Sequence, residues 1–203
     1  MAHRPCAAAV FEDFFGIMNI ELLIAEIRSL LNTTFVAIDE CFSMDERTRS
    51  YQPASGGWSI NQVLEHVSLT NHFLLILIEK GAKKAIINVE KMNLVEALRA
   101  YSFHRAKLEE VGKHQSFQWI RPEHMEPKGE KSMAEIQQLL KNQLKQCLDT
   151  LDKLPNGEGA LAKTTMTVND LGKIDVYEYI FFLAQHVQRH LMQIEKIRLE
   201  CES

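Results

Sequence analysis

The chain has 203 residues, a length that a single hydrophobic core can serve. Hydrophobic residues make up 46% and charged residues 25%, which supports a packed core. The formal net charge is −4 and the Lys and Arg residues are scattered, so we expect no nucleic-acid partner. No run approaches the roughly 18 apolar residues of a membrane-spanning helix, so we expect no membrane partner either.

The first 17 residues are interpreted as an N-terminal extension, and residues 18–203 as one helical domain. The extension lacks the continuous apolar region and the small-residue cleavage site of a secretory signal. Four cysteines are widely spaced and form no C-x-x-C pair, which favours free thiols in a reducing compartment over disulfides. We therefore expect a cytoplasmic protein, with the cysteines at Cys6, Cys41, Cys147 and Cys201.

Two amphipathic helices are expected in the first half of the domain. Apolar residues recur at intervals of three and four between about residues 19 and 45, which predicts the first helix. The Pro and glycines of segment 52–57 then break the chain. Ser59 followed by Gln62 is the pattern of a capping box and predicts the start of the second helix. We expect that helix to end at Gly81, because glycine commonly terminates helices.

Two further helices begin with the same kind of capping pattern. Ser132 with Glu135 opens one that ends before Pro155, and Asp175 with Glu178 opens the last. Both carry an apolar stripe at helical spacing, and no alternating strand pattern of any length is present. Four such helices predict an all-α fold, specifically a four-helix bundle.

The segment from about residue 82 to residue 131 is too long for a simple bundle turn, which usually takes about 2–8 residues. Asn93 with Glu96 suggests an extra helix over residues 94–111, followed by irregular chain. The connection between the second and third bundle helices could therefore cross the bundle, and a simple up-down-up-down order is not assured.

Two of the eight histidines, His186 and His190, are spaced i and i+4 on the last helix. This spacing places both imidazoles on one face, so that both can reach one metal ion. The face is the apolar, inward one, where a shared ion would satisfy two buried polar groups at once. The alternative is a hydrogen-bonded pair on a solvated flank.

A third ligand is expected from the second helix, where His66 borders the apolar stripe. His72 lies six residues later and points to another side, while His104, His114 and His124 are expected at the surface or in loops. No histidine has a Glu three residues before it, which excludes the Glu-x-x-His motifs of di-iron bundles. The H-E-x-x-H motif of zinc proteases and a cysteine-rich zinc site are absent as well. An all-histidine site remains.

These motifs resemble those of the DinB/YfiT-like superfamily of metalloenzymes. Segment 57–67, Gly-Trp-Ser-Ile-Asn-Gln-Val-Leu-Glu-His-Val, is similar to the start of the family's second helix, which carries its first metal histidine. Segment 186–194 is similar to the closing H-x-x-x-H-x-x-Q-I element, which supplies the other two. The resemblance covers residues 18–198 and implies a four-helix bundle with a divalent metal near one end. It also implies a homodimer, and His66, His186 and His190 as metal ligands.

Three neutral imidazoles suit zinc, nickel, copper or ferrous iron, and we expect zinc or nickel, or else iron. Such an ion either lowers the pKa of a bound water or holds a thiolate. The predicted function is therefore that of a metal-dependent hydrolase or a thiol-dependent transferase acting on a small-molecule substrate, with a low-molecular-weight thiol as a possible partner. The resemblance includes relatives of both kinds. The alternative is a non-catalytic bundle with a structural or vestigial metal site.

Five other residues are candidates for catalysis or substrate binding, and we expect none of them to be catalytic. Glu65 lies next to His66 but about 100° around the helix, so a solvated carboxylate is expected. Asp170, in the loop before the last helix, is a candidate for the bundle mouth. Trp58, Trp119 and Arg121 are candidates for the bundle mouth as well, where an aromatic residue and an Arg could bind an anionic substrate. We expect instead that the tryptophans pack on the core and that the Arg is solvated.

Overall fold

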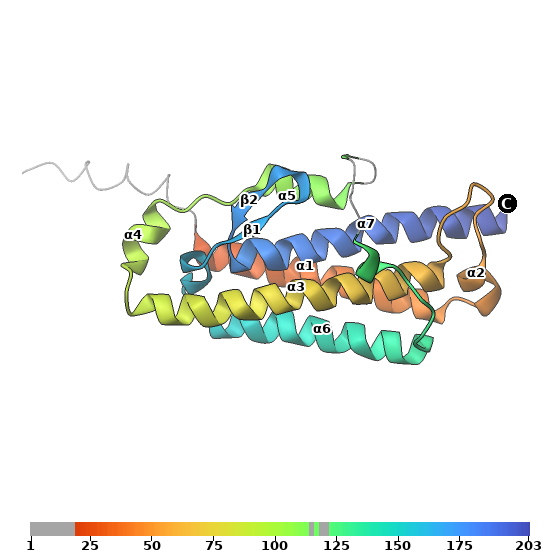
Figure 1. The fold of residues 1–203 in the computed structure, drawn as a ribbon, viewed down its shortest axis with the longest axis horizontal. Helices are drawn as coiled ribbons and strands as arrows, with labels where there is room; N and C mark the ends of the chain where they lie inside the picture. The colour runs from red at the N-terminus through yellow and green to blue at the C-terminus, as the bar shows by residue number, and fades with distance from the viewer. Residues whose placement is uncertain (1–18, 114–115, 118–121) are drawn as a thin grey trace, which may run out of the picture.

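The computed structural model describes residues 19–113, 116–117 and 122–203. Four long helices pack side by side along most of its length, which confirms the predicted all-α fold and four-helix bundle (Figure 1). The predicted extension, residues 1–17, lies outside the described residues, so the domain boundary at residue 18 stays a prediction. The bundle helices are α1 (Ile20–Glu40), α3 (Ile60–Val89), α6 (Met133–Lys153) and α7 (Val176–Glu202).

The three predicted capping boxes are present at the starts of α3, α6 and α7. At the start of α3 the backbone N–H of Gln62 donates to Ser59 Oγ, and the Gln62 side chain accepts from the backbone N–H of Ser59. Each reciprocal pair satisfies two of the N–H groups that a helix start leaves without a helical partner. Sequence therefore located these three helix starts correctly.

The predicted end of α3 at Gly81 is wrong, because the helix continues to Val89. A Cβ atom built on Gly81 would lie 3.0 Å from Cγ2 of Val176, in the first turn of α7. The glycine allows close packing between α3 and α7 instead of ending a helix. Sequence alone could not separate these two uses of glycine.

The bundle does not follow an up-down-up-down order. Helices α1 and α7 run in one direction, and α3 and α6 run in the other (Figure 1). The side-chain amide of Gln143 in α6 donates to the carbonyl of Ser68 in α3, each lying about ten residues into its helix. Two parallel helices that follow each other in the chain need a long connection, and residues 90–132 provide it.

This connection holds two short helices, α4 (Leu94–Arg99) and α5 (Arg105–Gly112), where one helix over residues 94–111 was predicted. That prediction is wrong because the buried carboxylate of Glu178 in α7 holds the break between them: its Oε1 accepts from the backbone N–H of His104 and lies 2.6 Å from His104 Nδ1. A short 3₁₀ helix, η3 (Glu123–Met125), precedes α6.

Small elements cover the ends of the bundle. The turn after α1 contains η2 (Cys41–Ser43) and α2 (Glu46–Ser50), and η4 (Glu158–Leu161) follows α6. A two-stranded antiparallel hairpin lies just before α7 and was not predicted, since three-residue strands are too short for an alternating pattern. Its strands, β1 (Thr164–Met166) and β2 (Gly172–Ile174), are joined through η5 (Val168–Asp170).

The described helices do not combine the length and apolar character that a membrane-spanning segment requires. Three described cysteines, Cys41, Cys147 and Cys201, are free thiols as predicted, while Cys6 lies outside the described residues.

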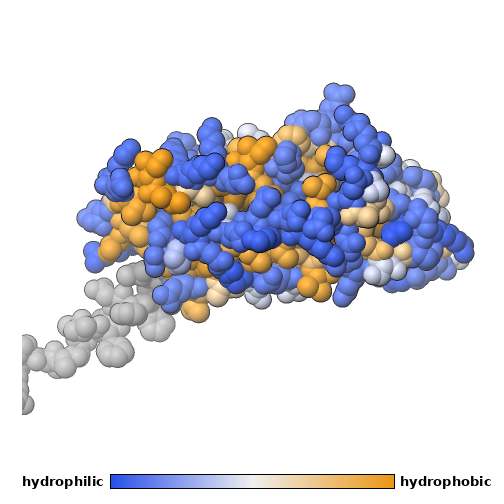
Figure 2. All heavy atoms as spheres, turned by 90° about the horizontal axis from the view of Figure 1, so that it is seen from below, coloured by the Kyte–Doolittle hydropathy of each residue, from blue (hydrophilic) through white to orange (hydrophobic). Residues whose placement is uncertain are grey.

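One face of the molecule is mostly hydrophilic, with hydrophobic residues gathered toward one end (Figure 2). Several exposed apolar side chains come from the end of α3 and from the chain that follows: Ile86, Ile87, Val89, Met92 and Val95.

Candidate metal centre

The structure brings the three predicted histidines together between α3 and α7. His66 comes from α3, and His186 and His190 lie one turn apart on α7. All three side chains are buried, and one ring nitrogen from each lies within 4.8 Å of the other two. The ring centroid of His66 is 5.4 Å from that of His186 and 4.8 Å from that of His190. The three nitrogens are close enough together that the group could hold a single metal ion.

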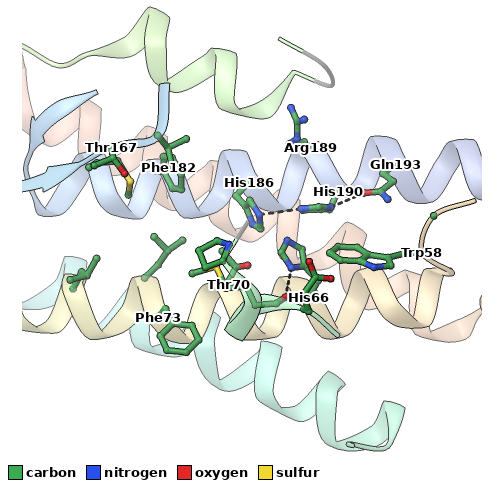
Figure 3. A pocket seen from close by; sticks show the side chains of 18 residues that line it. Trp58, His66, Thr70, Phe73, Thr167, Phe182, His186, Arg189, His190 and Gln193 are labelled. Carbon is green, nitrogen blue, oxygen red and sulfur yellow. Dashed lines mark hydrogen bonds between the residues drawn. The ribbon is translucent and has the colours of Figure 1, made fainter. Parts of the chain in front are cut away.

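The two histidines of α7 face each other, with their Nε2 atoms 3.1 Å apart (Figure 3). Nδ1 of His190 lies 2.9 Å from the side-chain oxygen of Gln193, which can only accept a hydrogen bond. In the neutral ring Nδ1 therefore carries the hydrogen, and Nε2 has the lone pair that a metal needs. The solvated-flank alternative is wrong, because both rings lie in the core.

The pKa of the His186 imidazole is unusually low. Burial lowers it well below the ordinary 6.5, and the neighbouring His190, His66 and Arg189 lower it further. A charged imidazolium is costly in this environment. His186 is therefore neutral at physiological pH, which is the protonation state that binds metals.

His66 is oriented by a segment of the crossing connection that we call the strap, residues 122–129. Nδ1 of His66 donates to the carbonyl oxygen of Met125 in the strap at 2.7 Å, which assigns the lone pair to Nε2. The neighbouring Glu65 holds the strap in place, because its carboxylate accepts from the backbone N–H groups of Lys128 at 3.1 Å and Gly129 at 2.8 Å.

The prediction that Glu65 is a solvated carboxylate is wrong. Its residue exposure is 4%, because the strap covers this part of α3. Helical spacing correctly placed the side chain away from the His66 face, but only the tertiary structure shows a second segment packed on that side. The sequence did not predict Met125 as a partner of His66, because a backbone carbonyl gives no residue-type signal. It contained Gln193 only as part of the family motif, without a predicted contact to His190.

The imidazoles border a cavity of about 750 Å³ (Figure 3). Trp58 lines one side, and the centroid of its ring lies 4.7 Å from the ring centroid of His66. Residues of α3, α7, the strap and the β1–β2 hairpin complete the described lining. A cavity of this size fits a small molecule beside the histidines.

A family model described as DinB superfamily matches residues 26–194. The chain belongs to the DinB superfamily. Neither a search of curated proteins nor one of solved structures found a match. The matched range includes all three histidines, and membership of this family agrees with the helical bundle.

The remaining histidines and Asp170 are not part of the three-histidine group in this DinB-superfamily chain, as far as the structure describes them. Asp170 does not line the cavity, and its backbone carbonyl accepts from Lys107 Nζ at 2.8 Å. His104 is the N-cap residue of α5, and its Nδ1 lies 2.6 Å from Glu178 Oε1. The ring of His124 packs on Phe73 with centroids 4.4 Å apart. His72 is exposed, as expected. Trp119, Arg121 and His114 lie outside the described residues.

Proposed function

We propose that His66, His186 and His190 bind one divalent metal ion, zinc or nickel or else iron, and that the protein is a metal-dependent enzyme. The observation that carries the proposal is the orientation of the rings beside a cavity. Acceptors at the Nδ1 atoms of His66 and His190 direct their Nε2 lone pairs toward the common centre. Three neutral imidazoles are a fitting donor set for these metals and a poor one for magnesium or calcium.

The chain's own residues supply the binding and orientation that such chemistry needs. The Met125 carbonyl and the Gln193 side chain fix two ring tautomers, and burial keeps His186 neutral. When bound, the ion would act as a Lewis acid on a water or thiol, which corresponds to hydrolysis or to thiol-dependent transfer. The cavity gives a small-molecule substrate access to that position.

The alternative, a structural or vestigial metal site in a non-catalytic bundle, has less support. A structural site is closed by protein ligands and by packed side chains. Here three histidines border a cavity, so the arrangement resembles the open sites of catalytic metals. The cytoplasmic location, the thiol partner and the homodimer stay proposals. Sedimentation equilibrium of the purified protein tests the homodimer.

Metal analysis of protein purified without a polyhistidine tag tests the proposed site. We expect about one zinc or nickel ion per chain. His190→Ala should abolish this uptake and leave the circular dichroism of the helices largely intact. His72→Ala is the matched control, because His72 is an exposed histidine of the bundle and should not affect uptake. A wild-type protein that takes up none of zinc, nickel and ferrous iron would refute the proposal.

A screen of the metal-loaded protein distinguishes the two reaction types. Ester and amide substrates test hydrolysis, and low-molecular-weight thiols combined with electrophiles test transfer. Turnover that requires the thiol assigns a transferase, and thiol-independent turnover assigns a hydrolase. No turnover in either arm, in a protein that binds the metal, favours the structural alternative.

A further inference from the structure

The hydroxyl group of Thr70 has an unusual environment. Thr70 lies one turn after His66 on the same face of α3, and its residue exposure is 6%. Its Oγ1 atom is buried and makes no hydrogen bond to any described residue. Leaving a buried hydroxyl without a partner is energetically costly, so such a group calls for an explanation.

Two other buried helical threonines show what is normal in this protein. Thr34 Oγ1 donates to the carbonyl of Leu30 at 2.6 Å, and Thr150 Oγ1 donates to the carbonyl of Gln146 at 2.8 Å. Both bond to the carbonyl four residues earlier, the partner that a helix always offers. Thr70 does not make the equivalent bond.

Thr70 instead lines the cavity next to the histidines. Figure 3 shows it beside His66 and His186, on the side that leads toward Phe73. On α3 the residues that follow Thr70 along the cavity wall are apolar. We call this part the apolar lobe; it consists of Phe73, Leu74 and Leu77 of α3, Phe182 of α7, and Met166 and Val168 of the hairpin region.

The lobe extends along the bundle away from the metal site. Thr70 and Leu77 are seven residues apart, which corresponds to about 10 Å along a helix. The two charged residues of the described lining, Glu126 and Arg189, belong to the histidine end instead. The Arg189 guanidinium donates to the backbone carbonyl of Lys113 and points away from the histidines (Figure 3).

We propose that this site takes a small molecule with a carbonyl-containing head and an uncharged apolar tail. The head lies at the three histidines, the Thr70 hydroxyl donates a hydrogen bond to its carbonyl oxygen, and the tail fills the apolar lobe. This substrate class rests on the proposed metal site and makes it more specific. Thr70 is then the residue that orients the substrate, and Leu77 limits the length of the tail.

Alkyl hydroxamates are suitable probes, because each carries a metal-binding carbonyl head and a tail of chosen length. Calorimetric titration of zinc-loaded protein with acetohydroxamate, butanohydroxamate and hexanohydroxamate should show affinity rising up to about fourfold per buried methylene. Leu77→Trp, which shortens the lobe, should remove the gain for the longest tail and leave acetohydroxamate binding unchanged. Affinity that is independent of tail length would overturn the proposal.

Thr70→Val removes the hydroxyl while keeping the shape of the side chain. We expect every hydroxamate to bind about two- to tenfold more weakly, with zinc affinity unchanged. Thr150→Val, a buried helical threonine outside the cavity lining, is the control and should bind all probes like the wild type. Equal probe affinities for Thr70→Val and wild type would refute the role of the hydroxyl.

The zinc titration that precedes these measurements tests the metal site separately. If zinc, nickel and ferrous iron all fail to bind, the proposed function is refuted, whereas normal zinc uptake without tail or hydroxyl effects would refute only the substrate class. The hydroxamates are also titrated into zinc-free protein, where the tail dependence should persist at weaker affinity. Loss of that dependence without zinc would show that the lobe does not bind apolar tails.

Discussion

Glu65→Gln tests whether the strap orients the proposed metal site. The wild-type carboxylate accepts from two backbone N–H groups of the strap, and the amide retains one accepting oxygen. A hydrogen bond to a charged group contributes about 1.5–3 kcal/mol, but Lys128 and Gly129 are exposed, so water can replace part of the loss. We therefore expect the free energy of unfolding to fall by about 1–2 kcal/mol.

The effect on metal affinity should be larger than this stability loss suggests. With the strap loosened, the Met125 carbonyl no longer holds the ring of His66, and loss of such an outer partner typically costs about 10- to 100-fold in affinity. Zinc affinity is measured by competition with a chromophoric chelator. Stability is measured by urea unfolding of the metal-free protein, since bound metal would itself raise it.

Glu135→Gln is the matched control for Glu65→Gln. The Glu135 carboxylate accepts from the backbone N–H of Ser132 at 2.8 Å and caps α6 away from the cavity lining. Because Gln also serves at this position of a capping box, the variant should keep most of its stability and wild-type zinc affinity. If Glu65→Gln loses stability but binds zinc like the wild type, the strap does not position His66 and the reasoning is refuted.

Three further variants test other parts of the structure. Gln193→Leu removes the acceptor at His190 Nδ1 and should weaken zinc binding about 10- to 100-fold in the same competition assay; unchanged affinity would contradict the tautomer assignment. Burial raises the pKa of the Asp175 carboxyl to about 7, so the folded state keeps a proton that the unfolded state releases near 4. The free energy of unfolding should therefore fall as pH rises from about 4 to 7. Asp175→Asn, which can still cap α7, should reduce this pH dependence when unfolding by urea is measured at several pH values. If the pH dependence of the unfolding free energy is the same for the variant and the wild type, the pKa shift is contradicted. Gly159→Ala would place a Cβ 2.7 Å from the Tyr177 ring and should cost about 1–3 kcal/mol in urea unfolding, with zinc affinity retained.

Local signals were sufficient for the bundle helices and for part of the site. Capping boxes located three helix starts, because each depends on residues only three positions apart. The spacing of His186 and His190 placed both rings on one helix face for the same reason. His66 needed the family motif in addition, since no local pattern relates α3 to α7.

Contacts between distant parts of the chain account for the predictions that were wrong. Glu65 is buried by a strap more than 60 residues away, and Glu178 splits the predicted helix over residues 94–111 by binding His104. Gly81 lies inside α3, where the absence of a side chain lets Val176 of α7 pack closely against the helix. In each case a residue type with a strong local preference was overridden by a long-range partner.

The sequence by itself thus determined the four helices, the inward pair His186 and His190, and, with the family motif, His66. Only the tertiary structure decided how these rings are oriented, since their Nδ1 partners include a backbone carbonyl from the strap. It also decided that the Thr70 hydroxyl, unlike those of Thr34 and Thr150, makes no hydrogen bond to the helix carbonyl four residues earlier.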